Sequence, residues 1–359
     1  MLGLMEDMID QSAVQHLLKP EALAPYLAER LPSGEIDAPL GAFRVRGGHS
    51  NETFFVWRGD ERWVLRRPPL GNYLPTAHDV AREFRVLVAL DTTPVPAPHP
   101  ILLCDDPAII GAPFYLMEAL DGVVLRGTTP EWGATPVARH AIGLELVDTL
   151  AQLHAVDWRT VGLEGFGRSE GYLERQVRRW AGQLDGARNR DIPDLDFVTN
   201  WLATHLPTSP AATIVHGDFR LDNAMFARGL PPRILGVLDW EMSTLGDPLA
   251  DLGYLLTFWR EPRDPPPALT AQQAWKLTEE PGYPTRAELI ARYMERTGLT
   301  LTTATLAFYR GLAAWKMAIL LEGSYKRFLA GATDDPFFRE LEHGVPALAA
   351  WAKDIVLGA

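Results

Sequence analysis

A short polar segment carries the residue types that phosphoryl transfer needs. His216, Gly217 and Asp218 are followed by Asn223, and Asp239 comes sixteen residues after that asparagine. Transfer of a phosphoryl group to a hydroxyl requires a carboxylate that orients the hydroxyl and accepts its proton, and oxygen ligands that hold Mg²⁺ against the nucleotide phosphates. We therefore predict that Asp218 is the catalytic base and that Asn223 and Asp239 are metal ligands.

Two apolar runs must position these side chains. Residues 211–215 and 233–238 are predicted strands, so residues 216–223 form the loop that leaves the first strand and Asp239 stands at the end of the second. Mg²⁺ prefers hard oxygen ligands and usually keeps several waters. One amide oxygen and one carboxylate, completed by substrate phosphates, would be enough to hold it.

The pattern H-G-D-x-x-x-x-N, then D-W-E at residues 239–241 and G-D-P-L-A-D-L at 246–252, resembles the aminoglycoside phosphotransferase and choline kinase-like family. The resemblance implies a two-lobed protein kinase-like α+β fold with ATP or GTP as the phosphate donor. Residues 1–118 would form a small antiparallel-sheet lobe with an N-terminal helix, and 119–359 a larger, mainly helical lobe with the catalytic loop and acceptor-binding insertions.

Some of the same residues have structural interpretations. Asp247 and Pro248 are a standard helix start, with Asp as the cap and Pro in the first turn. The resemblance implies that Asp251 braces the catalytic loop and that His216 stabilises it, because Asp218 already occupies the position of the base. Clustered carboxylates also occur in metal-dependent hydrolases, but the extra ligands of a dinuclear hydrolase site are missing from the motif.

A glycine-bearing turn stands where the family places its nucleotide-binding loop. Residues 43–46 and 53–57 read as strands, and the turn between them, 47–51, contains Gly48 and Ser50. A hairpin of this kind can lie over phosphates, although most are only turns. The resemblance implies that Gly48 and Ser50 contact the nucleotide.

The next predicted strand, residues 63–67, carries a basic residue at an informative position. Alternation along a strand puts Val64 and Arg66 on one face and Arg67 on the other. The resemblance implies that Val64 roofs the adenine and that Arg66 takes the place of a lysine that contacts the α- and β-phosphates. Because arginine offers a planar fork and lysine a point charge, this replacement leaves open a nucleotide-binding regulatory module without catalysis.

Two further nucleotide contacts follow from the resemblance. Residues 76–90 have a helical apolar face, and Glu83 beside it would pair with Arg66; the alternative is a solvated helix glutamate. Residues near Glu118 and Leu120 resemble the hinge between lobes, where adenine bonds to the backbone.

The second half of the chain is predicted to be mainly helical. Helices are expected over residues 136–156, 171–186, 197–206, 248–259, 286–297, 302–329 and 336–356. A loop-rich insertion over residues 261–284 interrupts them. Because loops on a fixed scaffold commonly carry specificity, this insertion and the helices near 165–206 are expected to bind the acceptor.

Composition narrows the functional classes. With 34 basic and 46 acidic residues the net charge is −12, which argues against general nucleic-acid binding. The single Cys104 excludes an intrachain disulfide and fits a reducing compartment. The acidic start differs from a secretory signal, and no uninterrupted apolar run approaches membrane-spanning length, so we expect a cytoplasmic protein.

The acceptor is the least determined part of the prediction. Arg175, Arg178 and Arg179 have helical spacing and would form either an anion-binding patch or a solvated face. Residues 63–69 and 239–248 look closest to the phosphotransferase-like domains fused to acyl-CoA dehydrogenases. That branch implies a hydroxyacyl-CoA or a similar anionic metabolite as acceptor, in preference to a polycationic aminoglycoside.

Overall fold

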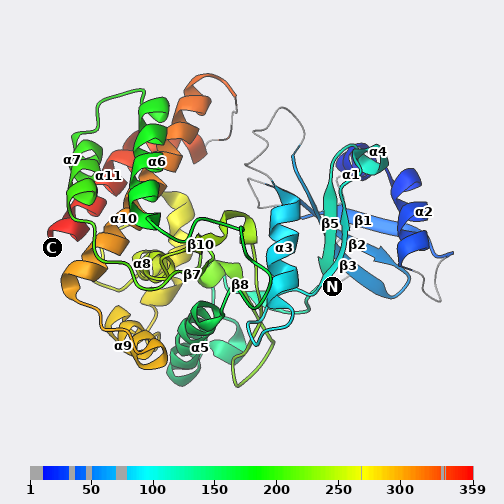
Figure 1. The fold of residues 1–359 in the computed structure, drawn as a ribbon, viewed down its shortest axis with the longest axis horizontal. Helices are drawn as coiled ribbons and strands as arrows, with labels where there is room; N and C mark the ends of the chain where they lie inside the picture. The colour runs from blue at the N-terminus through cyan, green and yellow to red at the C-terminus, as the bar shows by residue number, and fades with distance from the viewer. Residues whose placement is uncertain are drawn as a thin grey trace. The chain divides into compact units, whose positions relative to one another are not determined.

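The chain folds into two compact units, Met1–Asp121 and Gly122–Ala359 (Figure 1). The structure is a computed structural model. It describes residues 11–31, 37–45, 51–69, 79–267, 269–332, 335 and 337–358. The first unit contains an antiparallel sheet and the second is mainly helical, which confirms the predicted kinase-like α+β fold. Our expected boundary lay after residue 118.

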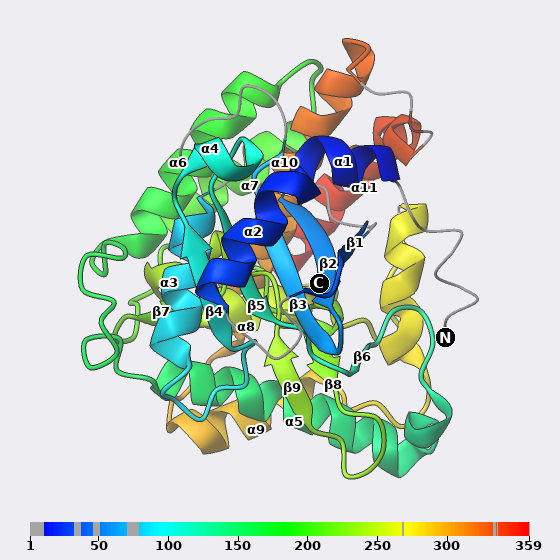
Figure 2. The same cartoon turned by 90° about the vertical axis from the view of Figure 1, so that its right-hand side faces the viewer.

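The first unit is built on a five-stranded sheet with the order β1-β2-β3-β5-β4, in which all neighbours are antiparallel (Figure 2). Its strands are β1 Leu40–Arg44, β2 Glu52–Arg58, β3 Glu61–Arg67, β4 Pro100–Cys104 and β5 Phe114–Glu118. Gly59, with φ of 58°, makes the tight turn from β2 to β3. The predicted strands around this turn are therefore present.

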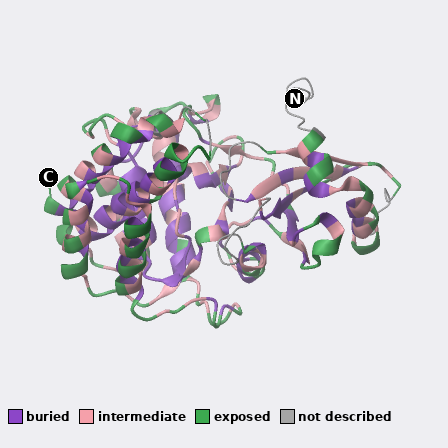
Figure 3. Ribbon diagram, turned by 90° about the horizontal axis from the view of Figure 1, so that it is seen from above, coloured by how far each residue is buried: buried purple, intermediate pink, exposed green. Residues whose placement is uncertain are grey.

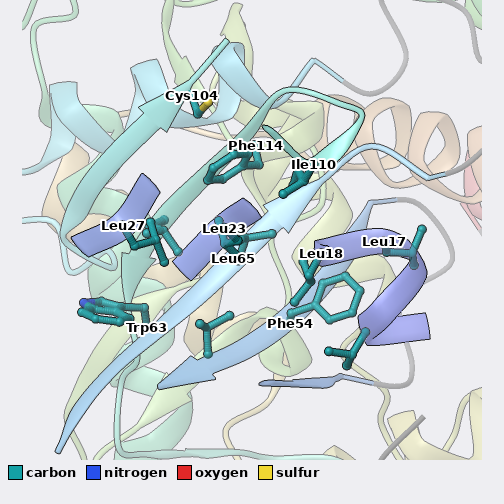
Figure 4. Close-up of a cluster of buried hydrophobic side chains, with 13 residues drawn as sticks. Leu17, Leu18, Leu23, Leu27, Phe54, Trp63, Leu65, Cys104, Ile110 and Phe114 are labelled. Carbon is teal, nitrogen blue, oxygen red and sulfur yellow. The ribbon is translucent and has the colours of Figure 1, made fainter. Parts of the chain in front are cut away.

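Helices α1 (Gln11–Leu18), α2 (Pro20–Arg30) and α4 (Pro107–Ile110) contribute to the main apolar core of this unit. Figure 4 shows Leu23 and Leu27 of α2 beside the side chains that the sheet presents on this face. Leu23 and Leu27 are fully buried, and such burial contributes about 2 kcal/mol for each leucine. The strand residues in this core are Phe54, Val56, Trp63, Leu65, Cys104, Phe114 and Leu116.

Helix α3 (Val80–Leu90) packs on the opposite face of the sheet. Asp79 caps it by accepting a hydrogen bond from the backbone N–H of Arg82 at 3.0 Å. The ring of Phe84 lies 5.8 Å from the ring of Tyr115, centroid to centroid. This packing buries the α3 face that carries Glu83 against β5.

The second unit holds two small sheets that frame the polar motifs. One pairs β7 (Thr213–Val215) with β10 (Thr244–Gly246), and the other has the order β6-β8-β9. Strands β6, β8 and β9 span Val123–Val124, Ala224–Phe226 and Ile234–Val237. Strands β7 and β9 confirm the predicted apolar runs, whereas β6 and β8 were not predicted because each is too short to show an alternating pattern.

Each predicted helix of the second half is present. The helices are α5 Pro136–Ala155, α6 Tyr172–Ala187, α7 Pro193–Thr204, α8 Leu249–Phe258, α9 Arg286–Thr297, α10 Thr303–Leu329 and α11 Phe337–Leu357. Short 3₁₀ segments are η3 Glu131–Gly133, η4 Leu221–Asn223, η5 Trp240–Met242 and η6 Thr270–Glu279. Figure 3 shows buried residues gathered along the inner faces of these helices.

The contact between α8 and α10 is unusually close at Gly253. A Cβ atom there would lie 2.5 Å from Cβ of Tyr309 and 2.7 Å from its carbonyl oxygen. Glycine thus lets α8 press against the backbone of α10.

Of the described helices, α10 alone is long and apolar enough to cross a membrane, and 56% of that apolar window is buried. A core helix passes the same test, so this is weak evidence for a membrane segment.

Candidate active site

The predicted catalytic loop, residues 216–223, runs from β7 to β8 and ends in the 3₁₀ turn η4. Gly217 has φ of 89°, a left-handed conformation that favours glycine. A Cβ atom there would also lie 2.7 Å from the carbonyl oxygen of Met242. The glycine of the motif is therefore required by the backbone path of the loop.

Asp251, on α8, holds the start of this loop. Its carboxylate accepts hydrogen bonds from the backbone N–H groups of His216 at 2.6 Å and Gly217 at 2.7 Å. His154 lies 3.3 Å from the same carboxylate and bonds to the hydroxyl of Tyr293 at 2.8 Å. Burial opposes ionisation of Asp251, but its interactions with His154, His216 and the N–H of Gly217 together outweigh burial and lower the pKa of Asp251. The predicted bracing role of Asp251 is confirmed.

The His216 side chain also stabilises the loop. Its Nε2 lies 2.9 Å from the carbonyl oxygen of Leu238, and its Nδ1 accepts the backbone N–H of Asp218 at 3.2 Å. The ring lies 4.6 Å from the ring of Trp240, centroid to centroid. Because protein groups occupy both ring nitrogens, the geometry agrees with a structural role and leaves the position of the base to Asp218.

Asp247 likewise has a structural role. Its Oδ1 accepts the backbone N–H of Leu249 at the start of α8, at 2.9 Å, and its Oδ2 accepts the hydroxyl of Tyr309 at 2.6 Å. Burial raises the pKa of Asp247. The aspartate therefore ties the start of α8 to α10, as the helix-start interpretation predicts.

The carboxylate of Asp218, the predicted base, is oriented from one side. Its Oδ2 accepts a hydrogen bond from Nδ2 of Asn223 at 2.8 Å, and its Oδ1 lies 3.3 Å from Nε of Arg220. Oδ1 is buried, and among the described residues no donor meets it at full hydrogen-bonding geometry, although the Tyr254 hydroxyl interacts with the Asp218 carboxylate. One oxygen is thus fixed, while the other is buried beside Arg220 and keeps unsatisfied hydrogen-bonding capacity.

Asn223 and Asp239 flank the paired ends of β8 and β9. Ala224 pairs with Val237, and the backbone N–H of Leu238 donates to the carbonyl oxygen of Asn223 at 2.8 Å. Asp239 follows directly, with φ of 66°, a left-handed conformation that is uncommon outside glycine and enriched in Asp and Asn. The sequence-predicted pair of ligands is therefore brought to neighbouring strand ends.

The orientation of Asn223 suits a hard cation. Its Nδ2 donates to both the carbonyl oxygen and Oδ2 of Asp218, each at 2.8 Å, which assigns the amide and turns Oδ1 away from Asp218. In the described part of the chain, no three His, Cys, Asp or Glu side chains form a metal cluster. A Mg²⁺ ion held by Asn223 and Asp239 would therefore take its other ligands from water and nucleotide phosphates.

Arg220 and Tyr254 border the predicted base and were not singled out in the sequence. Arg220 Nε lies 3.2 Å from Oδ1 of Asp222 as well as near Asp218. Burial disfavours its charge, but these carboxylates outweigh burial and raise the pKa of Arg220. Burial, followed by the charge of Asp218, raises the pKa of the Tyr254 hydroxyl well above its ordinary value. Both side chains therefore stay protonated beside Asp218.

A small cavity of about 30 Å³ opens beside the catalytic loop. It brings together polar groups of Arg220 and Asp222 and aromatic rings of Phe258, Trp259 and Trp275. Trp275 belongs to η6, within the insertion predicted to bind the acceptor, and the Arg220 guanidinium lies 5.9 Å from the centre of its ring. The insertion thus contributes to the surroundings of the catalytic loop.

The first unit contains the predicted ion pair. Arg66 Nε lies 3.3 Å from Oε2 of Glu83, and both side chains are buried. Glu83 also accepts hydrogen bonds from the Tyr115 hydroxyl, at 2.9 Å, and from the side chain of Asn51. The prediction that Glu83 pairs with Arg66 is confirmed, and the solvated alternative is wrong.

The remaining predicted nucleotide contacts have different outcomes. Arg67 turns to the other face of β3, where its guanidinium donates to the carbonyl oxygens of Leu17 and Ile110. The N–H of Glu118 donates to the carbonyl oxygen of His99 at 2.9 Å, and the adenine contact of Glu118 stays a prediction.

Val64 is half-buried on β3, opposite Met117 of β5, and Leu120 lies just beyond the end of β5. Gly48 and Ser50 lie outside the described residues. The nucleotide contacts of Val64, Leu120, Gly48 and Ser50 stay predictions.

Comparison with known sequences decides the family. Residues 43–289 match the family described as "Phosphotransferase enzyme family". The chain belongs to this family. It is a phosphotransferase of the aminoglycoside phosphotransferase type, a kinase that acts on a small-molecule hydroxyl, and kinases of this family use ATP.

Longer relatives share most of this chain. Human "Acyl-CoA dehydrogenase family member 11" is 38% identical over 328 residues, which cover 90% of this chain and 41% of that protein. The chain therefore spans about two fifths of the length of this curated relative and corresponds to its phosphotransferase region.

Solved structures agree with the family. A Ralstonia eutropha protein, provisionally described as an aminoglycoside phosphotransferase, is 32% identical with a TM-score of 0.77, over 94% of this chain and 98% of that one. Aminoglycoside phosphotransferase APH(4)-Ia, solved with AMP-PNP and hygromycin B, has a TM-score of 0.59 at 14% identity, over 94% of this chain and 99% of that one. The second likeness supports the fold alone.

Proposed function

We propose that the protein transfers the γ-phosphoryl group of ATP, with Mg²⁺, to a hydroxyl of a small metabolite, for which a hydroxyacyl-CoA is the first candidate. The observation that carries this proposal is the setting of Asp218. One of its oxygens is fixed by Asn223 at 2.8 Å, while the other meets no donor at full hydrogen-bonding geometry among the described residues. A general base needs such an oxygen with unused hydrogen-bonding capacity. Because Oδ1 is buried beside Arg220, the proposal requires that this side of Asp218 opens when the acceptor binds.

The proposed reaction follows from these contacts. The acceptor oxygen attacks the γ-phosphorus, the bond from that phosphorus to the β,γ-bridging oxygen breaks, and the acceptor proton passes to Oδ1 of Asp218. The products are a phosphate ester and ADP. Mg²⁺ bound at Asn223 and Asp239 would neutralise charge on the phosphates. Arg220 would keep Asp218 oriented, since it lies 3.3 Å from Oδ1.

The hydroxyacyl-CoA candidate is supported by kinship and by local charge. The human relative that shares 90% of this chain is named as an acyl-CoA dehydrogenase, so its phosphotransferase region is joined to a protein named for acyl-CoA chemistry. Arg126, Arg220 and Asp222 line the cavity beside the loop, together with several aromatic rings, so the charged lining is net positive. Repulsion between these guanidinium groups and the ammonium groups of an aminoglycoside would disfavour binding of that class of acceptor.

The experiment is a screen of acceptors with the purified chain, ATP and Mg²⁺. Hydroxyacyl-CoAs, hydroxy acids, choline, sugars and aminoglycosides would be compared for acceptor-dependent ADP release, and the phosphorylated product would be identified by mass. We expect release with a hydroxyacyl-CoA and a mass increase equal to one phosphoryl group. If no compound gave ADP release above that of a protein-free blank, the result would contradict the proposal and favour the regulatory module that Arg66 left open.

A further inference from the structure

Lys316, near the middle of α10, carries a positive charge that no neighbouring carboxylate pairs with at ion-pair distance among the described residues. Its ammonium lies 5.3 Å from the centre of the Trp180 ring, on α6. Among the described residues, it donates no hydrogen bond and lies within ion-pair distance of no carboxylate. The side chain is half-buried. Burying an ammonium group without an ion-pair partner costs free energy. We therefore expect either a ligand or another structural contact to compensate this cost.

The charge of Lys316 interacts with carboxylates at the catalytic loop. Burial lowers the pKa of Lys316 to about 8, the carboxylates of Asp251 and Asp218 oppose that change, and Arg179 adds to it. Lys316 therefore lies within electrostatic range of both the predicted base and a second cation. At neutral pH the ammonium remains mostly charged.

The arginines of α6 divide into different roles. Arg175 donates to the backbone carbonyl oxygens of Arg168 and Glu170, so it supports the loop before the helix. Arg178 and Arg179 are exposed, and in the described part of the chain neither makes a hydrogen bond or an ion pair. Of the predicted patch, Arg179 is the member whose charge acts on Lys316.

Another lysine shows what a purely structural contact of this kind looks like. Lys353, on α11, lies 5.4 Å from the centre of the Phe197 ring, and its ammonium also pairs with Asp194 at 2.8 Å. Both lysines lie over an aromatic ring, but only Lys353 has a carboxylate partner. The missing partner of Lys316 is therefore not a general feature of such contacts in this unit.

We propose that Lys316 and Arg179 bind an anionic group of the acceptor, a phosphate or a carboxylate, and thereby hold its hydroxyl at Asp218. This inference rests on the proposed function, because it assigns the acceptor side of the same site. The Trp180 ring supports the Lys316 ammonium and adds an apolar surface for the acceptor. Lys316 and Arg179 are specificity-determining residues that favour anionic acceptors over cationic ones.

The test measures binding directly. Calorimetry would be done on the full chain with saturating AMP-PNP and Mg²⁺, which prevents turnover and keeps CoA out of the nucleotide site. The probes are 3-hydroxybutyryl-CoA, which carries phosphates; 3-hydroxybutyrate, which carries a carboxylate; and the uncharged N-acetylcysteamine thioester of 3-hydroxybutyrate. The variants are Lys316→Met, Lys316→Arg and Arg179→Met, with Lys353→Met as the matched control.

We expect Lys316→Met to weaken binding of a charged probe by about 10- to 100-fold, the loss that one charge-assisted hydrogen bond represents. Arg179→Met should weaken it less, because Arg179 is more exposed, and Lys316→Arg should keep most of the affinity. The uncharged thioester should bind all variants alike, and Lys353→Met should match the wild type. If Lys316→Met weakens binding of the CoA probe alone, the group that Lys316 binds is a phosphate. If it weakens binding of 3-hydroxybutyrate, that group is a carboxylate.

Other outcomes overturn the inference. If the wild type binds no charged probe more tightly than the thioester, or if Lys316→Met weakens charged and uncharged probes equally, Lys316 has only a structural role. The outcome is separable from that of the acceptor screen. Charge-dependent binding without any phosphorylated product would defeat the proposed function alone, whereas phosphorylation of another acceptor without charge-dependent binding would defeat this inference alone.

Discussion

Replacing Asp251 by asparagine tests how the catalytic loop is held. The substitution keeps the shape of the side chain but turns one acceptor oxygen into an NH₂ group. That group must face either the N–H of His216 or the N–H of Gly217, which now bond to carboxylate oxygens at 2.6 Å and 2.7 Å. One charge-assisted bond is lost and one buried N–H is left without an acceptor, so unfolding should become easier by about 2–4 kcal/mol.

The same substitution should slow catalysis, because displacement of the loop moves Asp218. A shift of about 1 Å at the reacting groups costs on the order of 100-fold in rate. Urea denaturation followed by tryptophan fluorescence gives the stability, and turnover is measured well below the unfolding transition. Asp157→Asn is the control, since Asp157 pairs with Arg159 and both side chains are more than half exposed, where such pairs contribute about 1 kcal/mol or less. An Asp251→Asn protein as stable as this control would refute the reasoning.

Three more outcomes follow from the site. Asp218→Asn should lower kcat by about 10²- to 10⁴-fold while leaving the Kd of AMP-PNP unchanged; turnover within tenfold of wild type would remove Asp218 as the base. In Asp239→Ala, calorimetry should find AMP-PNP affinity that no longer increases with Mg²⁺, and a preserved increase would exclude Asp239 as a ligand. Binding of 3-hydroxybutyrate should weaken as pH rises through the Lys316 pKa of about 8, because the ammonium, which interacts electrostatically with Asp251, Asp218 and Arg179, loses its charge. Lys316→Met should show no such pH dependence; an identical decline in that variant would assign the titration elsewhere.

The catalytic loop could be predicted because its parts are close together in the sequence. The segment 216–223 and the strand before Asp239 fix their positions through local strands, and the structure brings Asn223 and Asp239 to paired strand ends. The Arg66–Glu83 pair was also predictable, since strand alternation gave the face of Arg66 and helical spacing gave the approximate face of Glu83.

Residues that depend on tertiary packing could not be found in this way. Tyr254, Trp275 and Lys316 come from α8, η6 and α10. No local pattern distinguishes a lysine whose charge interacts with that of Asp218 from a lysine on the surface. The helical spacing of Arg175 and Arg179 could not separate their roles. Only the structure shows that Arg175 donates hydrogen bonds to backbone carbonyl oxygens and that the charge of Arg179 lowers the pKa of Lys316. The strand β8, only three residues long, left no periodic signal.

The close approach of α8 and α10 at Gly253 links the helix that supports the catalytic loop to the helix that carries the proposed acceptor-binding lysine. Helix α8 carries the brace Asp251 and the neighbour of the base, Tyr254, while α10 carries Lys316. Because a single methyl group at Gly253 would collide with the α10 backbone, the two helices cannot slide independently. A relative with a different acceptor would therefore be expected to keep this helix pair in place and to change instead the exposed side chains of α6 and the insertion that carries Trp275.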